Sequence, residues 1–336
     1  MTVRYCTSSP TSFHMATRTV FLKALALLLL LPPLAHADVA IVLNSKDDDM
    51  SLIDTTTYKV IKRVPLGKEP HHLLPTPDNR YVVVANAAGN DLVLLDPPTG
   101  DVVKRIPRIA DPYHLGFSPD GKWFVINANR LDRVDIYRYD NGNLTLAAKL
   151  PLPKTTSHMT FSPDSRSVFV TVQESDEVAA IDLATQKLRW KTSTGKQPAG
   201  IWLTPDARHV LVGVMGEDYV DVIATADGKS LKHIVTGKGA HAFQAKGDGR
   251  HVFLSNRVDN TISVIDMIEL KVVDSFPVPG GPDDMELKKD GSELWVTSRW
   301  INRVTVIDLA TKKIKQSIRA GRSPHGIYFH NHAPRL

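Results

Sequence analysis

Apolar and polar residues alternate along this chain in short runs, and the runs recur at a nearly constant interval. Each unit begins with a short apolar run, passes through a turn such as Ser118-Pro119-Asp120-Gly121, and continues with three further short runs. No unit keeps the 3.6-residue spacing of apolar positions that an amphipathic helix requires. The pattern therefore predicts four short β-strands in each unit.

The units begin at seven positions, spaced by 42 residues except for one step of 44. The starts are Pro70, Pro112, Thr156, Pro198, Ala240, Pro282 and Pro324. Four-stranded units of about 40–45 residues are the sequence signature of β-propeller blades. One strand-like run follows Pro324, and residues 39–64 supply three more. We therefore predict an all-β, seven-bladed propeller that is closed by one C-terminal strand joining three N-terminal strands.

The first 37 residues differ in composition from the repeats. Arg18 and Lys23 lie before and inside an apolar stretch at 20–31, and Ala35-His36-Ala37 supplies the small residues of a cleavage site. The stretch is shorter than the roughly 20 apolar residues that span a bilayer. We predict a signal peptide at 1–37, cleaved after Ala37, and a single propeller domain at 38–336. The protein is expected in the periplasm or outside the cell, without stable membrane insertion.

Cysteine usage and charge exclude several cofactors and partners. Cys6 is the single cysteine and lies in the predicted signal peptide, so we expect no Cys-ligated metal and no c-type haem in the exported domain. Removing Arg4, Arg18 and Lys23 from 41 basic residues leaves 38, against 36 acidic ones. This balance gives no support for a nucleic-acid partner. We expect a monomer whose partner is a small ligand or a periplasmic protein.

Several segments of the repeat resemble the YVTN family of β-propeller proteins. The resemblance rests on Val168-Phe169-Val170-Thr171, Leu294-Trp295-Val296-Thr297-Ser298, Val264-Ile265-Asp266 and the Ser-Pro-Asp turns, and it covers residues 38–329. It implies an extracytoplasmic ring in which the first strand of each unit lines the central axis. It implies no single activity, because related propellers include lactonases, haem binders and copper enzymes.

Histidines gather at one place in the repeat, in the two positions that follow each unit start. These positions hold His71, His72, His114, His158, His241, His325, Asp283 and Asp284. Neutral imidazole is the commonest protein ligand for transition metals, and a carboxylate can complete such a site. In the family layout these residues lie at the mouth of the central channel. We predict that they hold copper, zinc or a metallocofactor there; the alternative is that each histidine caps a strand.

Strand geometry limits how many of these rings are expected to converge. Side chains alternate along a strand, so His71 and His72 should point to different sides. His72, His114 and His158 share one position in their units and form the best-supported ligand set. Ring closure should place His325 beside His71, with the aspartate pair across the channel. Arg257, Arg299 and Trp300, in loops of the same face, are predicted to contact a ligand.

Four functions remain open from the sequence. The first is an exported binding or interaction protein that holds a metal or metallocofactor. The second is a metal-dependent enzyme, either a copper-type oxidoreductase or a hydrolase, with an open coordination position for substrate. The third is a lactonase-like hydrolase, and the fourth is a metal-free interaction scaffold. No complete catalytic set is evident in the sequence, so a binding role is favoured over an enzyme.

Overall fold

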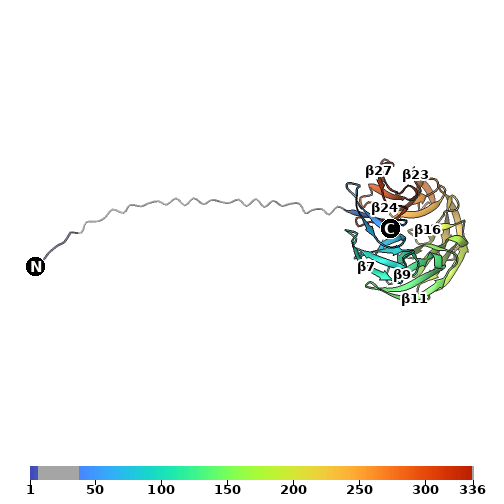
Figure 1. Ribbon diagram of the computed structural model, residues 1–336, viewed down its shortest axis with the longest axis horizontal. Coiled ribbons are helices and arrows are strands. Elements are labelled where there is room, and N and C mark those ends of the chain that lie inside the picture. Colours follow the sequence, from blue (N-terminus) through green and yellow to red (C-terminus); the bar gives the residue numbers. More distant parts are fainter. Residues whose placement is uncertain (7–37, 335–336) are drawn as a thin grey trace. The chain divides into compact units, whose positions relative to one another are not determined.

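The computed structural model describes residues 1–6 and 38–334. Residues 38–334 form a ring of seven sheets, each built from four antiparallel strands (Figure 1), which confirms the predicted propeller. The predicted signal peptide lies outside the described residues, apart from 1–6. Within the described part of the chain, no helix has the length and apolar character needed to cross a membrane.

Each sheet runs from an innermost strand to an outermost one. The innermost strands are β4 (Pro70–Pro75), β8 (Pro112–Phe117), β12 (Thr156–Phe161), β16 (Pro198–Leu203), β20 (Ala240–Ala245), β24 (Pro282–Leu287) and β28 (Pro324–Phe329). The second strands are β1 (Val39–Asn44), β5 (Val82–Asn86), β9 (Trp123–Ala128), β13 (Ser167–Val172), β17 (His209–Val214), β21 (His251–Asn256) and β25 (Glu293–Ser298). The seven predicted unit starts are therefore the first residues of the seven inner strands.

The third strands are β2 (Asp49–Asp54), β6 (Asp91–Leu95), β10 (Arg133–Asp140), β14 (Glu177–Asp182), β18 (Tyr219–Ala224), β22 (Thr261–Asp266) and β26 (Arg303–Asp308). The outermost strands are β3 (Val60–Pro65), β7 (Val102–Pro107), β11 (Asn143–Pro151), β15 (Lys187–Ser193), β19 (Ser230–Val235), β23 (Lys271–Pro277) and β27 (Lys313–Arg319). Three short 3-10 turns, η1 (Asn129–Leu131), η2 (Gln173–Ser175) and η3 (Arg299–Ile301), link second and third strands.

Ring closure follows the predicted pairing of the two ends. β28 pairs antiparallel with β1, placing Phe329 opposite Ala40 and Ile327 opposite Val42. The closing sheet has the order β28-β1-β2-β3. Closure leaves neither β28 nor β1 with a free hydrogen-bonding edge on the side where they meet, which removes a template for aggregation.

The hydrophobic core lies between neighbouring sheets. All six residues of β13 are buried, because both faces of a middle strand pack against adjacent blades. The outermost strand β3, in contrast, is exposed along most of its length. At the closure, Trp295 of one blade and Phe329 of the next pack edge to face with ring centroids 5.8 Å apart. Packing between blades therefore holds the inner strands in a fixed ring around the channel.

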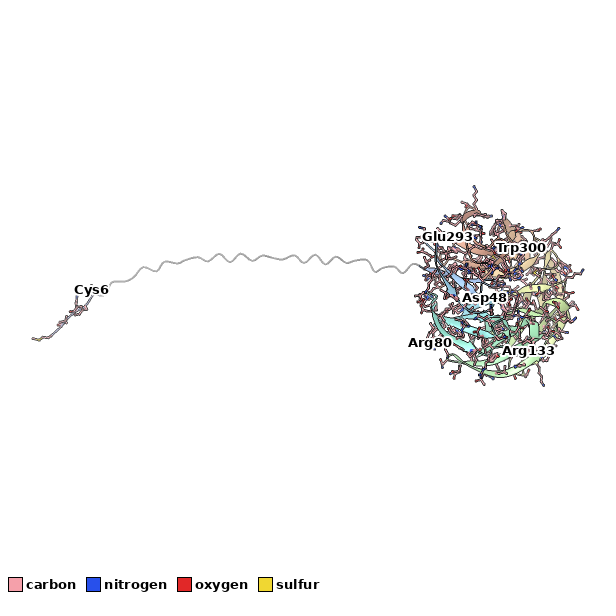
Figure 2. All side chains as sticks on the ribbon, in the orientation of Figure 1. Cys6, Asp48, Arg80, Arg133, Glu293 and Trp300 are labelled. Carbon is pink, nitrogen blue, oxygen red and sulfur yellow. The ribbon has the colours of Figure 1, made fainter. Side chains whose placement is uncertain are left out.

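Glu293 (Figure 2) lies at the interface between the blade of Trp295 and the blade of Phe329. Its substitution gives our first prediction. The Tyr58 hydroxyl and Lys315 Nζ each donate to Oε1 at 2.6 Å, and Trp295 Nε1 donates to Oε2 at 3.0 Å. Burial alone would raise the pKa of Glu293, but these partners outweigh it and lower the pKa from 4.5 to about 2. We expect Glu293→Gln to lower the free energy of unfolding by about 2–3 kcal/mol at pH 7.

The pH dependence of this effect has a defined sign. A depressed carboxyl pKa stabilises the fold above the unfolded value, and the contribution is lost as the pH falls through the folded value. Urea unfolding of the unmodified protein and of Glu293→Gln measures the difference in their free energies of unfolding. This difference should be largest at pH 7 and should decrease between pH 4.5 and about 2. A difference that stays constant down to pH 2 would contradict the assigned role of Glu293.

Candidate metal centre

A β-bulge at the start of each inner strand aims the predicted site residues into the channel. In β4, Pro70 pairs with Asn86 and Leu73 pairs with Val84, so the inner strand carries one extra residue. The same shift occurs in the other six inner strands. A bulge interrupts side-chain alternation and redirects the side chains beside it. The histidine positions of the repeat coincide with these bulges.

The bulge overturns the expectation that His71 and His72 point to different sides. Their ring centroids lie 4.6 Å apart, and their Nδ1 atoms are separated by 2.8 Å. His71 also packs against His325 of the neighbouring blade, with 3.8 Å between ring centroids and the ring planes tilted by 35°. The predicted contact between His71 and His325 is thus present, and both neighbouring histidines join one cluster.

All six predicted histidines meet inside the channel. His72 lies 4.5 Å from His114, 5.2 Å from His158 and 4.6 Å from His325, measured between ring centroids. His158 lies 5.3 Å from His241. The cluster is buried, since His325 is 0% and His72 is 7% exposed.

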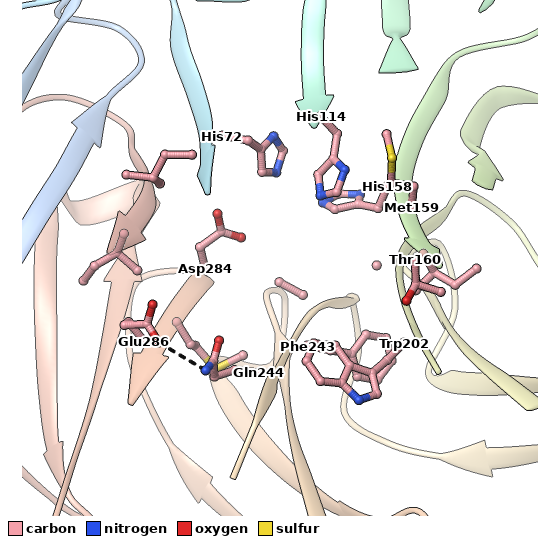
Figure 3. Close-up of a pocket in the computed structure, with 16 residues that line it drawn as sticks. His72, His114, His158, Met159, Thr160, Trp202, Phe243, Gln244, Asp284 and Glu286 are labelled. Carbon is pink, nitrogen blue, oxygen red and sulfur yellow. Dashed lines mark hydrogen bonds between the residues drawn. The ribbon is translucent and has the colours of Figure 1, made fainter. Parts of the chain in front are cut away.

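Three of these histidines form the best candidate for a metal site (Figure 3). One ring nitrogen from each of His72, His114 and His158 lies within 4.8 Å of the other two. Within residues 38–334, no hydrogen-bond partner reaches His72 Nε2, His114 Nδ1 or His158 Nε2, although all three atoms are buried. Buried polar atoms are normally paired, so three converging unpaired nitrogens fit a metal ion.

Hydrogen bonding and burial prepare these rings for that role. His72 Nδ1 donates to the backbone oxygen of Tyr113 at 2.8 Å, which leaves the lone pair on Nε2. Burial, reinforced by neighbouring histidines, lowers the pKa of His72 and His158 well below 6.5. Burial also lowers the pKa of His114 to about 4. The three imidazoles are therefore neutral near pH 7, which is the form that binds metals.

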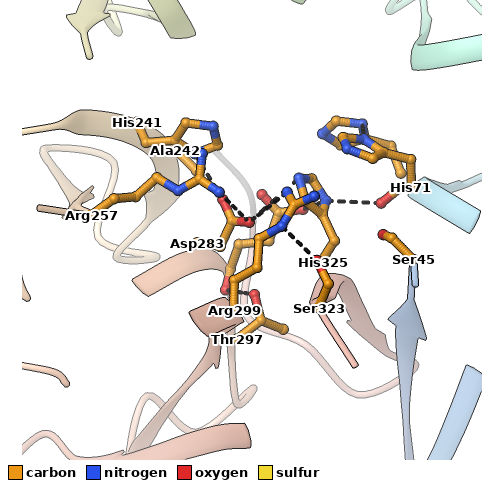
Figure 4. Close-up of polar contacts among 12 residues, drawn as sticks. Ser45, His71, His241, Ala242, Arg257, Asp283, Thr297, Arg299, Ser323 and His325 are labelled. Carbon is orange, nitrogen blue, oxygen red and sulfur yellow. Dashed lines mark hydrogen bonds and ion pairs between the residues drawn. The ribbon is translucent and has the colours of Figure 1, made fainter. Parts of the chain in front are cut away.

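Asp283 organises a second part of the cluster (Figure 4). Arg257 Nη2 and Arg299 Nη1 each lie 3.2 Å from its Oδ2, and His241 Nδ1 lies 2.9 Å from its Oδ1. Burial opposes ionisation, but the charges of His325, Arg257 and His241 outweigh it and hold the pKa of Asp283 well below its usual range. Asp283 is thus occupied by two guanidinium groups, which compete with any metal for its oxygens.

The predicted position of the aspartate pair was wrong. Asp284 Oδ2 lies 3.3 Å from His325 Nδ1 and Asp283 Oδ2 lies 3.5 Å from His325 Nε2, so the pair contacts His325 instead of facing it. The reason is that β24 and β28 are neighbours in the ring. Burial would raise the pKa of Asp284, but His325 counteracts it and the pKa falls to about 2. Asp284 is therefore an ionised carboxylate at the edge of the three-histidine site.

The three residues predicted to contact a ligand separate in the structure. Arg257 and Arg299 are 15% and 22% exposed and bind Asp283. Trp300 (Figure 2), in η3, is 56% exposed, and its ring lies against Gly281. Gly281 has φ +66°, and a Cβ built there would collide with the Trp300 ring. Trp300 therefore lies on the exposed surface and does not belong to the buried cluster.

A cavity of about 240 Å³ adjoins the three histidines, and its far wall was missed from the sequence. Trp202, Phe243 and Gln244 line it, one or two residues further along the inner strands than the histidine position. At the histidine position itself, β16 and β20 carry Gly200 and Ala242, so no large side chain enters the cavity there. The repeat register could have identified these residues, because it places them, like the histidines, on the inner strands that line the axis.

Comparison with solved structures shows the same ring in proteins of distant sequence. A functionally unknown protein from Desulfotomaculum acetoxidans DSM 771 superposes with a TM-score of 0.74 at 17% identity, covering 87% of this chain and 98% of that one. The periplasmic gluconolactonase PpgL of Pseudomonas aeruginosa gives 0.72 at 19% identity, covering 87% and 98%. At these identities the similarity establishes the fold alone.

A third similar structure is the dihydro-heme d1 dehydrogenase NirN in complex with DHE, with a TM-score of 0.66 at 18% identity, covering 87% of this chain and 75% of that one. A search of curated proteins finds no match. A family model described as a YNCE-like beta-propeller matches residues 14–335. With its seven closed blades and a match over nearly its whole length, the chain belongs to the YNCE-like β-propeller family.

Proposed function

We propose that this protein binds one divalent transition-metal ion, copper or zinc, through His72, His114 and His158. The observation that carries the proposal is the set of three buried, unpartnered ring nitrogens from three adjacent blades. Neutral imidazole suits both metals, and copper binds such ligands more tightly than zinc. The bond from His72 Nδ1 to Tyr113 O is the kind of outer contact that orients a ligating histidine.

The site leaves one side free for a further ligand. Three protein ligands in a four-coordinate site leave one open position, as in catalytic zinc sites. The three histidines and Asp284 also line the adjacent cavity, from which a further ligand would reach a bound metal. A second candidate function is therefore a metal-dependent enzyme, a hydrolase or a copper-type oxidoreductase. Because one structurally similar protein is named a gluconolactonase, gluconolactone is the first substrate to assay.

The proposal includes export and the repeat type. The apolar stretch at 20–31 and the Ala35-His36-Ala37 segment support cleavage after Ala37 and a periplasmic or secreted location. The segments Val168–Thr171 and Leu294–Ser298 support YVTN-type units. We further propose that the mature protein is a monomer that binds a small ligand or a periplasmic protein.

Elemental analysis of the untagged mature protein tests the metal site. We expect close to one copper or zinc per chain, and loss of that metal in the His72/His114/His158 triple alanine variant. The matched control replaces His209, His233 and His251, which lie outside the channel cluster, and should keep the metal. A metal-free protein after loading with copper and zinc, or equal metal in both triple variants, would refute the site and favour a metal-free scaffold.

A further inference from the structure

We infer that Arg257 and Arg299 bind the carboxylate group of a small organic monoanion, on the face that carries the loops between second and third strands. This anion site is separate from the cavity beside the three histidines, because neither arginine nor Asp283 lines that cavity. It is also independent of the proposed metal ion. Figure 4 shows the two guanidinium groups meeting at the carboxylate of Asp283.

The two arginines occupy equivalent positions in adjacent blades. They lie 42 residues apart, which is one repeat, and they directly follow the second strands β21 and β25. Arg257 Nη2 and Arg299 Nη1 both donate to Asp283 Oδ2, each at 3.2 Å. One carboxylate oxygen therefore serves two guanidinium groups.

This sharing leaves several arginine N–H groups without an oxygen acceptor. A guanidinium group has five N–H donors. Within residues 38–334, Arg257 Nε is buried without a partner, and Arg257 Nη1 meets only Met215 Sδ, at 3.7 Å. Arg299 donates from Nε to Ser323 Oγ at 2.8 Å, and its Nη2 has no acceptor in the same part of the chain. Because buried donors are normally paired, the two arginines require a further acceptor.

A conventional ion pair in the same propeller shows what is missing. Arg133 donates from Nε to Asp135 Oδ1 at 2.7 Å and from Nη2 to Oδ2 at 3.1 Å, so one guanidinium group takes both oxygens of one carboxylate. Such paired donation is the strong mode of arginine–carboxylate recognition. Asp283 provides it to neither Arg257 nor Arg299. Their side chains are 15% and 22% exposed, so a second carboxylate can reach them from solvent.

The charge balance selects an anion with a single negative charge. Two guanidinium groups and the carboxylate of Asp283 sum to one positive charge. His241 adds none near pH 7, because burial and the charge of Arg257 lower its pKa. Asp284 contacts His325, and among the described residues it forms no ion pair with either arginine. A monoanion neutralises the remaining charge, whereas a dianion would leave an excess negative charge beside Asp283.

Saturation-transfer NMR with acetate tests the inference on the metal-free mature protein, in a buffer without carboxylate or phosphate. The methyl signal of acetate reports binding, and acetamide is the neutral molecule of the same shape. Sodium sulfate and sodium chloride serve as a competing dianion and a competing spherical monoanion. We expect acetate to bind at least about tenfold more tightly than acetamide, sulfate or chloride.

Variants of Arg299 assign the signal to this site. Arg299→Gln removes one guanidinium group and should weaken acetate binding by about tenfold or more. Arg299→Lys keeps a positive charge beside Asp283 but loses the planar fork, so binding should weaken by about threefold or more. If Arg299→Gln fails to fold, Arg299→Lys is the variant that tests the site. Arg133→Gln is the matched control, because the Arg133 side chain is 21% exposed and already paired with Asp135, and it should leave acetate binding unchanged.

The outcomes separate this anion site from the proposed metal site. If the acetate signal is absent, or is unchanged in the Arg299 variants, the inference is overturned and water pairs with the free arginine donors. Equal binding of acetamide, sulfate or chloride also overturns it, because the ligand class would be wrong. The protein carries no metal in this experiment, so a negative result leaves the three-histidine site standing. A failed metal analysis would likewise leave the acetate result unaffected.

Discussion

Deletion of residues 324–336 is expected to abolish folding of the propeller. It removes β28 and with it Ile327, Tyr328 and Phe329, which are 5%, 2% and 0% exposed. Burial of a large apolar side chain contributes about 1.5–3 kcal/mol, so the three together contribute roughly 5–9 kcal/mol. A typical domain has a net stability of only about 5–15 kcal/mol. Circular dichroism and thermal unfolding should show no cooperative transition.

The same deletion also opens the ring. Loss of β28 exposes the backbone edge of β1, which favours aggregation. Deletion of residues 1–37 is the control, because it removes the predicted signal peptide and leaves every strand of the ring in place; its unfolding transition should be preserved. A C-terminally truncated protein that still unfolds cooperatively at the original temperature would show that the closure is dispensable.

Asp283→Asn is expected to have the largest effect among single substitutions in the cluster. The change removes the carboxylate that holds Arg257 and Arg299, and it leaves two largely buried guanidinium groups without a counter-charge. Loss of one partner from a buried ion pair costs about 3–5 kcal/mol. We expect the free energy of unfolding to fall by about 3 kcal/mol, at the lower end of this range, because both arginines retain some exposure to solvent. Urea unfolding at pH 7 measures the difference.

A double-mutant cycle with Arg257→Met isolates this interaction. After Arg257 is removed, Asp283→Asn should cost less than it does alone, because one uncompensated charge has gone with it. Because the pKa of Asp283 lies well below its usual range, the stabilisation is present at neutral pH and is lost only in strong acid. Strictly additive effects of the two substitutions would refute the role of Asp283 as the charge centre of the cluster.

Metal content of the Asp283→Asn variant distinguishes the two parts of the cluster. The three-histidine site does not depend on Asp283 for a ligand, so the folded variant should keep its metal. Asp284→Asn is the matched comparison, since Asp284 lines the cavity beside the histidines. It should also keep the metal, because the three ligands of the proposed site are His72, His114 and His158.

Much of the fold could be predicted from the sequence, because the same pattern of four strands recurs in each unit of a repeat protein. The 42-residue spacing located the first residue of every inner strand, from Pro70 to Pro324. The same register placed His72, His114 and His158 at equivalent points of three adjacent blades, which the structure brings within 4.8 Å of one another. Equivalent positions in a closed ring face one axis, so sequence periodicity alone predicted their convergence.

The arrangement of the side chains within the cluster could not be read in the same way. Strand alternation wrongly separated His71 from His72, because a bulge depends on the pairing register between two strands. The capture of Arg257 and Arg299 by Asp283 depends on side chains from neighbouring blades reaching the same point. In the sequence, Trp202 and Phe243 look like ordinary apolar residues of a strand. They line a cavity only because the folded ring brings their strands together around a narrow channel.

The sequence by itself determined the number of blades, the closure of the ring and the layer that carries the histidines, because these follow from local periodicity repeated along the chain. Only the tertiary structure decided which nitrogens remain unpaired, which carboxylate is neutralised by arginine and where space is left for a ligand. Those properties depend on distances between strands that lie far apart in sequence, and on the exclusion of water from the channel, and no local pattern encodes either.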